Sequence, residues 1–255
     1  MTRSKLISYV RNKISRGIPS IGSWMQLNNS SVAEIMGHSG YDWIVIDMEH
    51  GSIDVSDLPD LCRAIELGNS LPLVRLRTSD SHYCKIVLDS GAGGIVIPNL
   101  NSSKDLESIA SASRWPPVGK RGVGFSRANL FGKKFDDYRK DEALNPIIIG
   151  MIETIEGLKN IQEILSEKIL DAVIIGPYDL SASLGITGDI ENNILKKKIE
   201  EIKLICDEFS IPCGIHITTS DKDLLLKSIK NGFKFIPYCS DGIFFVKSSG
   251  IPIDS

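Results

Sequence analysis

The sequence lacks the features that mark secreted, membrane-spanning or nucleic-acid-binding proteins. Its five cysteines are dispersed and form no C-x-x-C pair, which is typical of reduced thiols that fill the core of a cytoplasmic protein. No apolar run is long enough to cross a bilayer, and the basic N-terminus has no apolar signal segment. The net charge of -3 gives no attraction to nucleic acid or to an anionic membrane. We therefore expect a soluble, cytoplasmic protein that acts on small molecules.

The composition is that of an ordinary globular protein. The chain has 255 residues, of which 42% are hydrophobic and 24% are charged, so it is long enough to bury a large core. Nothing in the sequence separates a second unit, and we expect a single domain that covers residues 1–255.

Short apolar runs alternate with helical segments along most of the chain. The predicted strands are 19–27, 43–50, 71–77, 95–98, 147–154, 171–179, 212–217 and 233–238. Eight strand–helix units in about 250 residues are the pattern of a (β/α)8 barrel, also called a TIM barrel. A doubly wound open sheet is the alternative, but no glycine fingerprint follows the first strand.

Two segments depart from this alternation. Leu6, Val10 and Ile14 recur at helical spacing and predict a short helix before the barrel. Between the fourth and fifth strands, residues 114–145 form a long, partly irregular connection. A connection of this length is usually functional, often as the cover of an active site.

Two apolar runs each end on one carboxylate, Glu153 and Asp179. The segment 156–168 between them reads as a helix, which implies neighbouring parallel strands with a right-handed crossover. Since neighbouring strands lie ~4.8 Å apart, the two carboxylates would meet at one rim, where they suit a hard divalent cation. The alternative interpretation is that each carboxylate caps the helix that follows it.

Polar residues at the predicted strand ends map to a single rim of the barrel. They are Gln26, Asp47, Glu49, His50, Arg75, Glu153 and Asp179. Active sites of this fold lie at the C-terminal ends of the strands, so this convergence predicts a catalytic centre there.

His50 is the candidate general base, and Asp47 would orient its ring. The run Asp47-Met48-Glu49-His50 is not H-E-x-x-H, so it does not imply zinc protease chemistry. In a regular strand Asp47 and His50 point to opposite faces, so His50 reaches the rim only if the strand ends by Glu49. A structural histidine is the alternative, and we expect His38, His82 and His216 to be structural.

Two further features suit the binding of an anion. Arg75 lies inside an apolar strand and needs an anionic partner, either a core carboxylate or a substrate. Gly176 and Pro177 would let the backbone approach a ligand, and the helix that follows would offer free N–H groups.

These residues together resemble a known family, the HpcH/HpaI aldolase/citrate lyase family and its metal-dependent class II pyruvate aldolases. The motifs are Gly40-Tyr41-Asp42-Trp43, Asp47-Met48-Glu49-His50, Val74-Arg75, Pro116-Pro117-x-Gly119-x-Arg121-Gly122-Val123-Gly124, Ile152-Glu153-Thr154 and Ile175-Gly176-Pro177-Tyr178-Asp179-Leu180-Ser181. They occur in this order and extend from about Gly22 to Asp241.

The resemblance implies reversible aldol cleavage of a 4-hydroxy-2-oxo acid to pyruvate and an aldehyde. Glu153 and Asp179 would bind the divalent cation, Mg²⁺, Mn²⁺ or Co²⁺, which stabilises the pyruvate enolate. Arg75 would stabilise the same charge, and Asp47 and His50 would serve proton transfer.

Other residues would bind water and substrate. Glu49 would hold metal-bound water, and the backbone of Gly176, Pro177 and Tyr178 would receive the pyruvate carboxylate. No lysine ends a predicted strand, which argues against a Schiff-base mechanism.

The sequence departs from the family pattern in two places. Met151 stands where relatives carry Gln, so one polar contact with the substrate is missing. Little chain remains after the eighth strand for the helix that often packs across subunits in this family. A homo-oligomer is still expected, although not by that route.

The aldehyde partner is left open. Arg127 and Asn129 would contact a hydroxylated aldehyde, which makes a 2-keto-3-deoxy sugar acid an attractive substrate, or they support the loop itself. A lyase that cleaves an acyl-CoA thioester, as in the citrate lyase beta type, and a non-catalytic barrel remain alternative functions.

Overall fold

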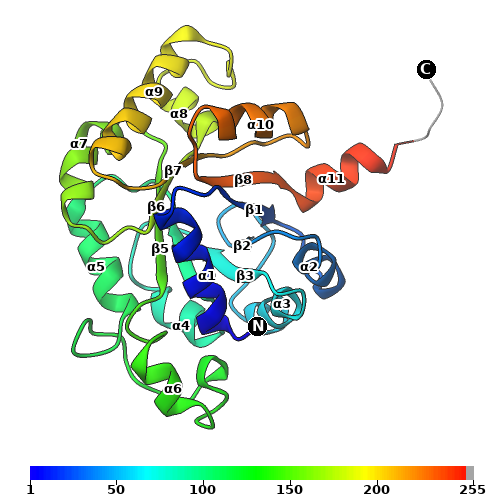
Figure 1. Cartoon of the computed structure of the whole chain (residues 1–255), viewed down its shortest axis with the longest axis vertical. Helices are drawn as coiled ribbons and strands as arrows, with labels where there is room; N and C mark the ends of the chain where they lie inside the picture. The colour runs from blue at the N-terminus through cyan, green and yellow to red at the C-terminus, as the bar shows by residue number, and fades with distance from the viewer. Residues whose placement is uncertain (251–255) are drawn as a thin grey trace.

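The computed structural model describes residues 1–250 and forms a closed ring of eight parallel strands (Figure 1). The strands pair in the order β7-β6-β5-β4-β3-β2-β1-β8. They are β1 (Ser20–Met25), β2 (Trp43–Asp47), β3 (Leu71–Arg75), β4 (Gly94–Ile97), β5 (Ile147–Ile152), β6 (Ala172–Ile175), β7 (Cys213–Ile215) and β8 (Phe235–Ser240). The Lys234 N–H donates to the Cys213 carbonyl at 2.7 Å, which closes the ring between β7 and β8. The predicted (β/α)8 barrel is confirmed.

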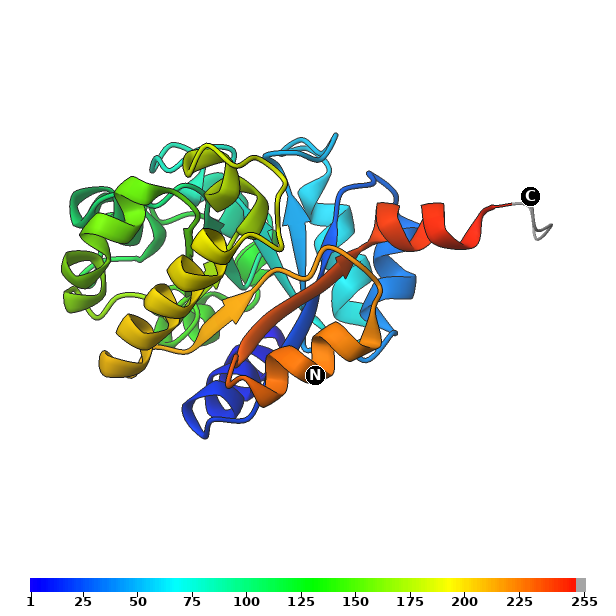
Figure 2. The same cartoon turned by 90° about the horizontal axis from the view of Figure 1, so that it is seen from above.

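Helices surround this ring (Figures 1 and 2). They are α1 (Arg3–Ser15), α2 (Ser30–Gly37), α3 (Leu58–Leu67), α4 (Cys84–Asp89), α5 (Ser103–Ser113), α6 (Phe135–Lys140), α7 (Ile155–Ser166), α8 (Pro177–Ser183), α9 (Asn193–Glu208), α10 (Lys222–Lys230) and α11 (Asp241–Ser248), with a 3-10 turn η1 (Arg127–Asn129). The helix α11 was not predicted. It extends away from the barrel in both views and exposes Phe245 and Val246.

The sixth strand is shorter than predicted. It ends at Ile175, and Pro177 is the first residue of α8, so Asp179 lies in the first turn of a helix. Proline has no N–H for a sheet ladder, and its fixed φ suits the first helical position. The prediction that Asp179 ends a strand is therefore wrong.

The interior of the barrel is a separate apolar cluster that α1 closes at one end. Leu6, Ile7, Val10 and Ile14 of α1 pack in one cluster with strand residues such as Trp43. Figure 1 shows α1, in dark blue, lying over the ring of strands. The predicted N-terminal helix thus serves as the plug at the N-terminal ends of the strands.

The strand residues inside the barrel follow a period of two that leads directly to the polar rim. Trp43 and Val45 belong to the interior cluster, as do Leu71 and Leu73. Asp47 and Arg75 are the next members of these two rows. Ile147, Ile149 and Met151 lead in the same way to Glu153. Because β2, β3 and β5 are apolar on both faces up to these last residues, this alternation cannot be seen in the sequence.

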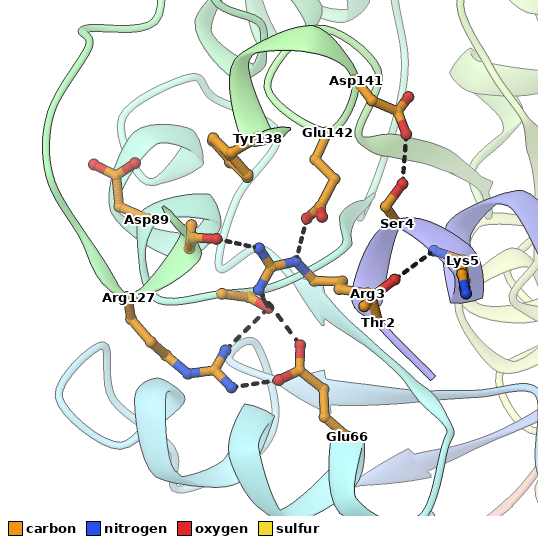
Figure 3. A network of polar contacts seen from close by, with 12 residues as sticks. Thr2, Arg3, Ser4, Lys5, Glu66, Asp89, Arg127, Tyr138, Asp141 and Glu142 are labelled. Carbon is orange, nitrogen blue, oxygen red and sulfur yellow. Dashed lines mark hydrogen bonds and ion pairs between the residues drawn. The ribbon is translucent and has the colours of Figure 1, made fainter. Parts of the chain in front are cut away.

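A partly buried charge network ties α1 to the outer elements (Figure 3). Arg3 pairs with Glu142 at 2.6 Å and Glu66 at 3.4 Å, and it donates to the Gly91 carbonyl at 3.2 Å. Arg127 also pairs with Glu66. On the same helix, Arg11 forms a two-point contact with Asp171 at 2.7 and 3.1 Å.

Replacing Arg3 with methionine should lower the free energy of unfolding by roughly 2–4 kcal/mol, because Glu142 loses its partly buried partner and Glu66 keeps only Arg127. Urea unfolding at pH 7 measures this loss. Arg3→Lys keeps the charge but not the planar guanidinium group. Its free energy of unfolding should therefore lie between those of the unmodified protein and Arg3→Met. A loss below ~1 kcal/mol would show that the network is not a stabilising clamp.

The long connection packs beside this network rather than over the strand ends. Its own small core contains Trp115, Ala128, Tyr138 and Ala143. Arg127 bonds to Glu66, and the Asn129 side chain is buried and bonds to backbone groups of the same loop, including the Gly124 carbonyl at 2.7 Å. Of the two interpretations of Arg127 and Asn129, the structure of this chain favours loop support.

All five cysteines are buried and unpaired, as predicted for core-filling thiols. Within residues 1–250, no helix has the length and apolar character needed to cross a membrane.

Candidate active site

A cavity of about 290 Å³ opens at the C-terminal ends of the strands. Its lining residues are Trp24, Gln26, His50, Arg75, Met151, Gly176, Pro177, Tyr178, Asp179, His216, Thr218, Ser240 and Ile243. Of the predicted rim residues, Gln26, His50, Arg75 and Asp179 line this cavity directly. No residue of the segment 114–145 is among the described residues that line this cavity, so the prediction that the segment covers the site is wrong for this chain.

Asp47 and Arg75 form a buried two-point ion pair at the base of the site. The Arg75 Nε and Nη2 groups donate to the Asp47 carboxylate at 2.8 and 2.6 Å. Arg75 Nη1 contacts Glu49 at 2.9 Å, and Gln26 Nε2 donates to Asp47 at 3.1 Å. Arg75 thus has carboxylate partners within the protein, and it still reaches the cavity.

The ionisation of this group follows from its contacts. Burial raises the pKa of Asp47, but the hydrogen bonds and charge of Arg75 outweigh it and hold that pKa below its usual value. Burial also raises the pKa of Glu49, against the opposing charge of Arg75. Asp47 therefore stays a carboxylate that fixes the orientation of Arg75.

His50 reaches the cavity because β2 ends at Asp47, which satisfies the condition set by the strand alternation. Asp47 Oδ1 accepts the backbone N–H groups of Glu49 and His50, at 3.0 and 3.2 Å. Asp47 therefore fixes the backbone of Glu49 and His50. It does not orient the imidazole ring, contrary to our prediction. The His50 residue is exposed, which leaves its ring accessible to a substrate proton.

Glu153 is the most perturbed acid of the site. Its Oε1 accepts the Asn99 N–H at 2.7 Å, whereas Oε2 is buried without a hydrogen-bond partner among residues 1–250. Burial, opposed by the Asn99 N–H and reinforced by the charge of Asp179, raises the pKa of Glu153 to about 7. A Cβ at position 176 would collide with Glu153 Oε2, so glycine is needed there.

The donors at Glu153 and Asp179 fit a hard divalent cation. A buried carboxylate oxygen without a partner lies beside a second carboxylate, and oxygen donors are what Mg²⁺ and Mn²⁺ prefer. Among residues 1–250, no three His, Cys, Asp or Glu side chains form a metal-binding group. Two protein carboxylates would thus leave several positions for water and substrate.

Three more predicted residues line the cavity. Gly176, Pro177 and Tyr178 line the cavity at the start of α8, whose first N–H groups have no partner within the helix. Met151 is buried in the barrel interior and also lines the cavity. It presents a thioether where an amide would supply a polar contact.

Sequence reasoning missed two residues of the site. Asn99 joins Glu153 to Glu49, to which its side chain donates at 3.4 Å, and its φ is 45°. In the sequence, Asn99 follows Pro98 directly after a predicted strand. Asparagine is one of the few residues that often adopt a left-handed backbone conformation, so its presence there was a usable signal. His216, which we expected to be structural, lines the cavity and stacks on Trp24, with ring centroids 4.7 Å apart.

A barrel with acids, a histidine and an arginine at the C-terminal ends of its strands defines an enzyme-like site. The family model for HpcH/HpaI aldolase/citrate lyase matches residues 20–248. The chain belongs to this family.

Curated relatives cover nearly the whole chain. A hydroxypyruvate/pyruvate aldolase of Roseobacter denitrificans is 34% identical and covers 91% of this chain and 90% of its own. A 4-hydroxy-2-oxovalerate aldolase of Novosphingobium aromaticivorans is 32% identical, and the match covers 93% of this chain and 90% of that protein.

Solved structures share the fold. A family protein from Burkholderia cenocepacia has a TM-score of 0.88 at 28% identity, with 94% of this chain and 96% of that chain covered. A citrate lyase beta subunit from M. tuberculosis, complexed with oxaloacetate and magnesium, has a TM-score of 0.58 at 13% identity, with 92% and 97% covered.

Proposed function

We propose that this protein is a divalent-metal-dependent aldolase that cleaves a 4-hydroxy-2-oxo acid to pyruvate and an aldehyde, and also joins them. Its family and the known activities of its relatives support an aldolase. The single observation that carries the metal requirement is the unpaired, buried Oε2 of Glu153 beside the charge of Asp179.

The protein groups have separate roles in this reaction. A cation bound by Glu153 and Asp179 would supply a Lewis acid to the substrate carbonyl group. Arg75, held by Asp47, offers a fixed positive charge where negative charge develops on the keto oxygen. His50 is the accessible group for proton transfer.

The remaining groups bind the substrate and water. The first turn of α8, at Gly176, Pro177 and Tyr178, would receive the carboxylate of the oxo acid. Glu49, placed between Arg75 and Asn99, would hold a water molecule near the reacting carbon. These assignments need no lysine, because the negative charge is stabilised electrostatically and not through a Schiff base.

Deuterium exchange into the methyl group of pyruvate tests this function without knowledge of the aldehyde. The protein is incubated with pyruvate in D₂O and the methyl signal is followed by proton NMR. Mg²⁺ or Mn²⁺ should support the exchange, and a chelator should stop it. Glu153→Gln should remove it even in excess cation, whereas the matched surface variant Glu200→Gln on α9 should retain it.

Exchange that continues in the chelator would contradict the metal requirement. An absence of exchange, when added Mn²⁺ measurably stabilises the protein, would exclude the pyruvate aldolase. A test for acyl-CoA thioester cleavage would then examine the remaining lyase activity of the family.

A further inference from the structure

Three unpaired polar atoms occur at one wall of the cavity. Trp24 Nε1, His216 Nε2 and Ser240 Oγ are buried without a hydrogen-bond partner among residues 1–250. All three residues line the cavity, at the ends of β1, β7 and β8. A buried donor or acceptor without a partner costs about 1–3 kcal/mol. Three of them together indicate a surface that a ligand completes, and we call these three residues the polar wall.

The backbone of β8 is distorted where it brings Ser240 into the polar wall. Gly22 pairs with Pro237, but Trp24 pairs with Ser240, so β8 contains one extra residue. Cys239, within this bulge, has a φ of 60°, and a left-handed conformation costs such a residue roughly 1–2 kcal/mol. A bulge re-aims the side chain that follows it. With regular alternation from Phe235, Ser240 would face away from the barrel interior.

Stacking holds the other two members of the wall. The rings of Trp24 and His216 lie 4.7 Å apart with an angle of 30° between them. The Arg75 guanidinium carbon lies 5.1 Å from the centre of the Trp24 ring. The backbone N–H of His216 donates to the Ile175 carbonyl at 3.0 Å. The polar wall is therefore rigid and adjoins the group that stabilises the reacting oxygen.

The wall is polar but carries no charge. Burial, reinforced by the charge of Arg75, lowers the pKa of His216 to about 4. The imidazole is thus neutral near pH 7, and its one unpaired nitrogen, Nε2, can form one hydrogen bond with a ligand. The Trp24 indole only donates, and the Ser240 hydroxyl does both. This combination matches a neutral hydroxyl group, whereas a carboxylate or phosphate would find no balancing cation in the wall.

We propose that Trp24, His216 and Ser240 recognise a hydroxyl group of the substrate and so make the enzyme selective for hydroxylated reaction partners over their alkyl analogues. The assignment rests on the proposed aldolase function. The hydroxyl group can belong to either reactant, that is, to the aldehyde or to the oxo acid. An alkyl analogue would leave the buried polar atoms unpaired, and sites of this kind reject such analogues strongly.

Two matched substrate pairs locate the hydroxyl group. Glycolaldehyde is compared with propanal, each with pyruvate, and hydroxypyruvate is compared with 2-oxobutanoate, each with one common aldehyde. In each pair a hydroxyl group replaces a methyl group at nearly constant size. The protein should prefer the hydroxylated member of at least one pair by ~10-fold or more in kcat/KM.

Variants then assign this preference to the wall. His216→Leu and Ser240→Ala should each reduce the preference by about tenfold, mainly through a higher KM for the hydroxylated partner. His38→Leu, on an exposed histidine at the end of α2, is the matched control and should keep the preference.

The assignment is overturned if neither pair shows a preference, or if both variants slow the two members of a pair equally. The exchange of pyruvate in the unmodified protein separates the two hypotheses. Exchange with no hydroxyl preference would remove only the role of the polar wall. An absence of exchange with bound cation would remove the aldolase function as well.

Discussion

Glu153→Gln should make the cation-free protein more stable while it lowers the rate of pyruvate exchange by ~10³-fold or more. The gain in stability and the loss of exchange have one cause. The Glu153 carboxylate is buried with one oxygen unpaired, a costly arrangement that only a bound cation would compensate. Glutamine has no charge to desolvate, and it can still accept the Asn99 N–H.

The gain in stability should depend on pH. Burial raises the pKa of Glu153 from 4.5 to about 7, so the folded state binds this proton more tightly than the unfolded state. The resulting stabilisation is fully present below about pH 4.5 and is lost as the pH rises through about 7. Its size is about 3 kcal/mol. Because glutamine does not titrate, the advantage of the variant should appear between pH 5 and pH 8.5.

Urea unfolding in the presence of a chelator, at pH 5 and at pH 8.5, measures this difference. Glu200→Gln is the control and should follow the unmodified protein at both pH values, because Glu200 is exposed. Added Mn²⁺ should stabilise the unmodified protein and have no effect on Glu153→Gln. A variant that is less stable than the unmodified protein at pH 8.5 in chelator would refute the account of Glu153.

The second large effect is expected from Arg75→Met. This change leaves the fully buried Asp47 carboxylate without its two-point partner, which should cost about 3–5 kcal/mol at pH 7. Pyruvate exchange should fall by ~10²–10³-fold, because the fixed positive charge at the keto oxygen is lost. Urea unfolding and proton NMR measure the two effects separately.

A double variant shows whether the loss arises from an unpaired charge. Arg75→Met combined with Asp47→Leu removes both charges, so it should be more stable than Arg75→Met alone. Arg75→Lys keeps the charge without the fork and should be only partly destabilised. If the double variant loses the sum of the two single effects, the ion pair contributes no coupling.

The polar rim could be predicted because parallel strands place their C-terminal ends together. Asp47, Arg75 and Glu153 each follow an apolar run, and the structure continues the interior rows of the barrel through all three. His50 was ambiguous, since its position depended on whether β2 ended by Glu49. The strand ends at Asp47 because that side chain accepts the next backbone N–H groups.

The sequence by itself determined the order of strands and helices, the barrel, and the strand-end residues of the site, because local periodicity and chain direction are enough for these features. Only the tertiary structure decided which residues share the cavity from distant strands. His216 and Ser240 meet Trp24 because closing the ring places β7, β8 and β1 side by side. The connection at 114–145 packs beside the N-terminal plug because Arg3 and Glu142 pair across 139 positions. Such contacts depend on ring closure and charge pairing between distant segments, and no local pattern encodes either one.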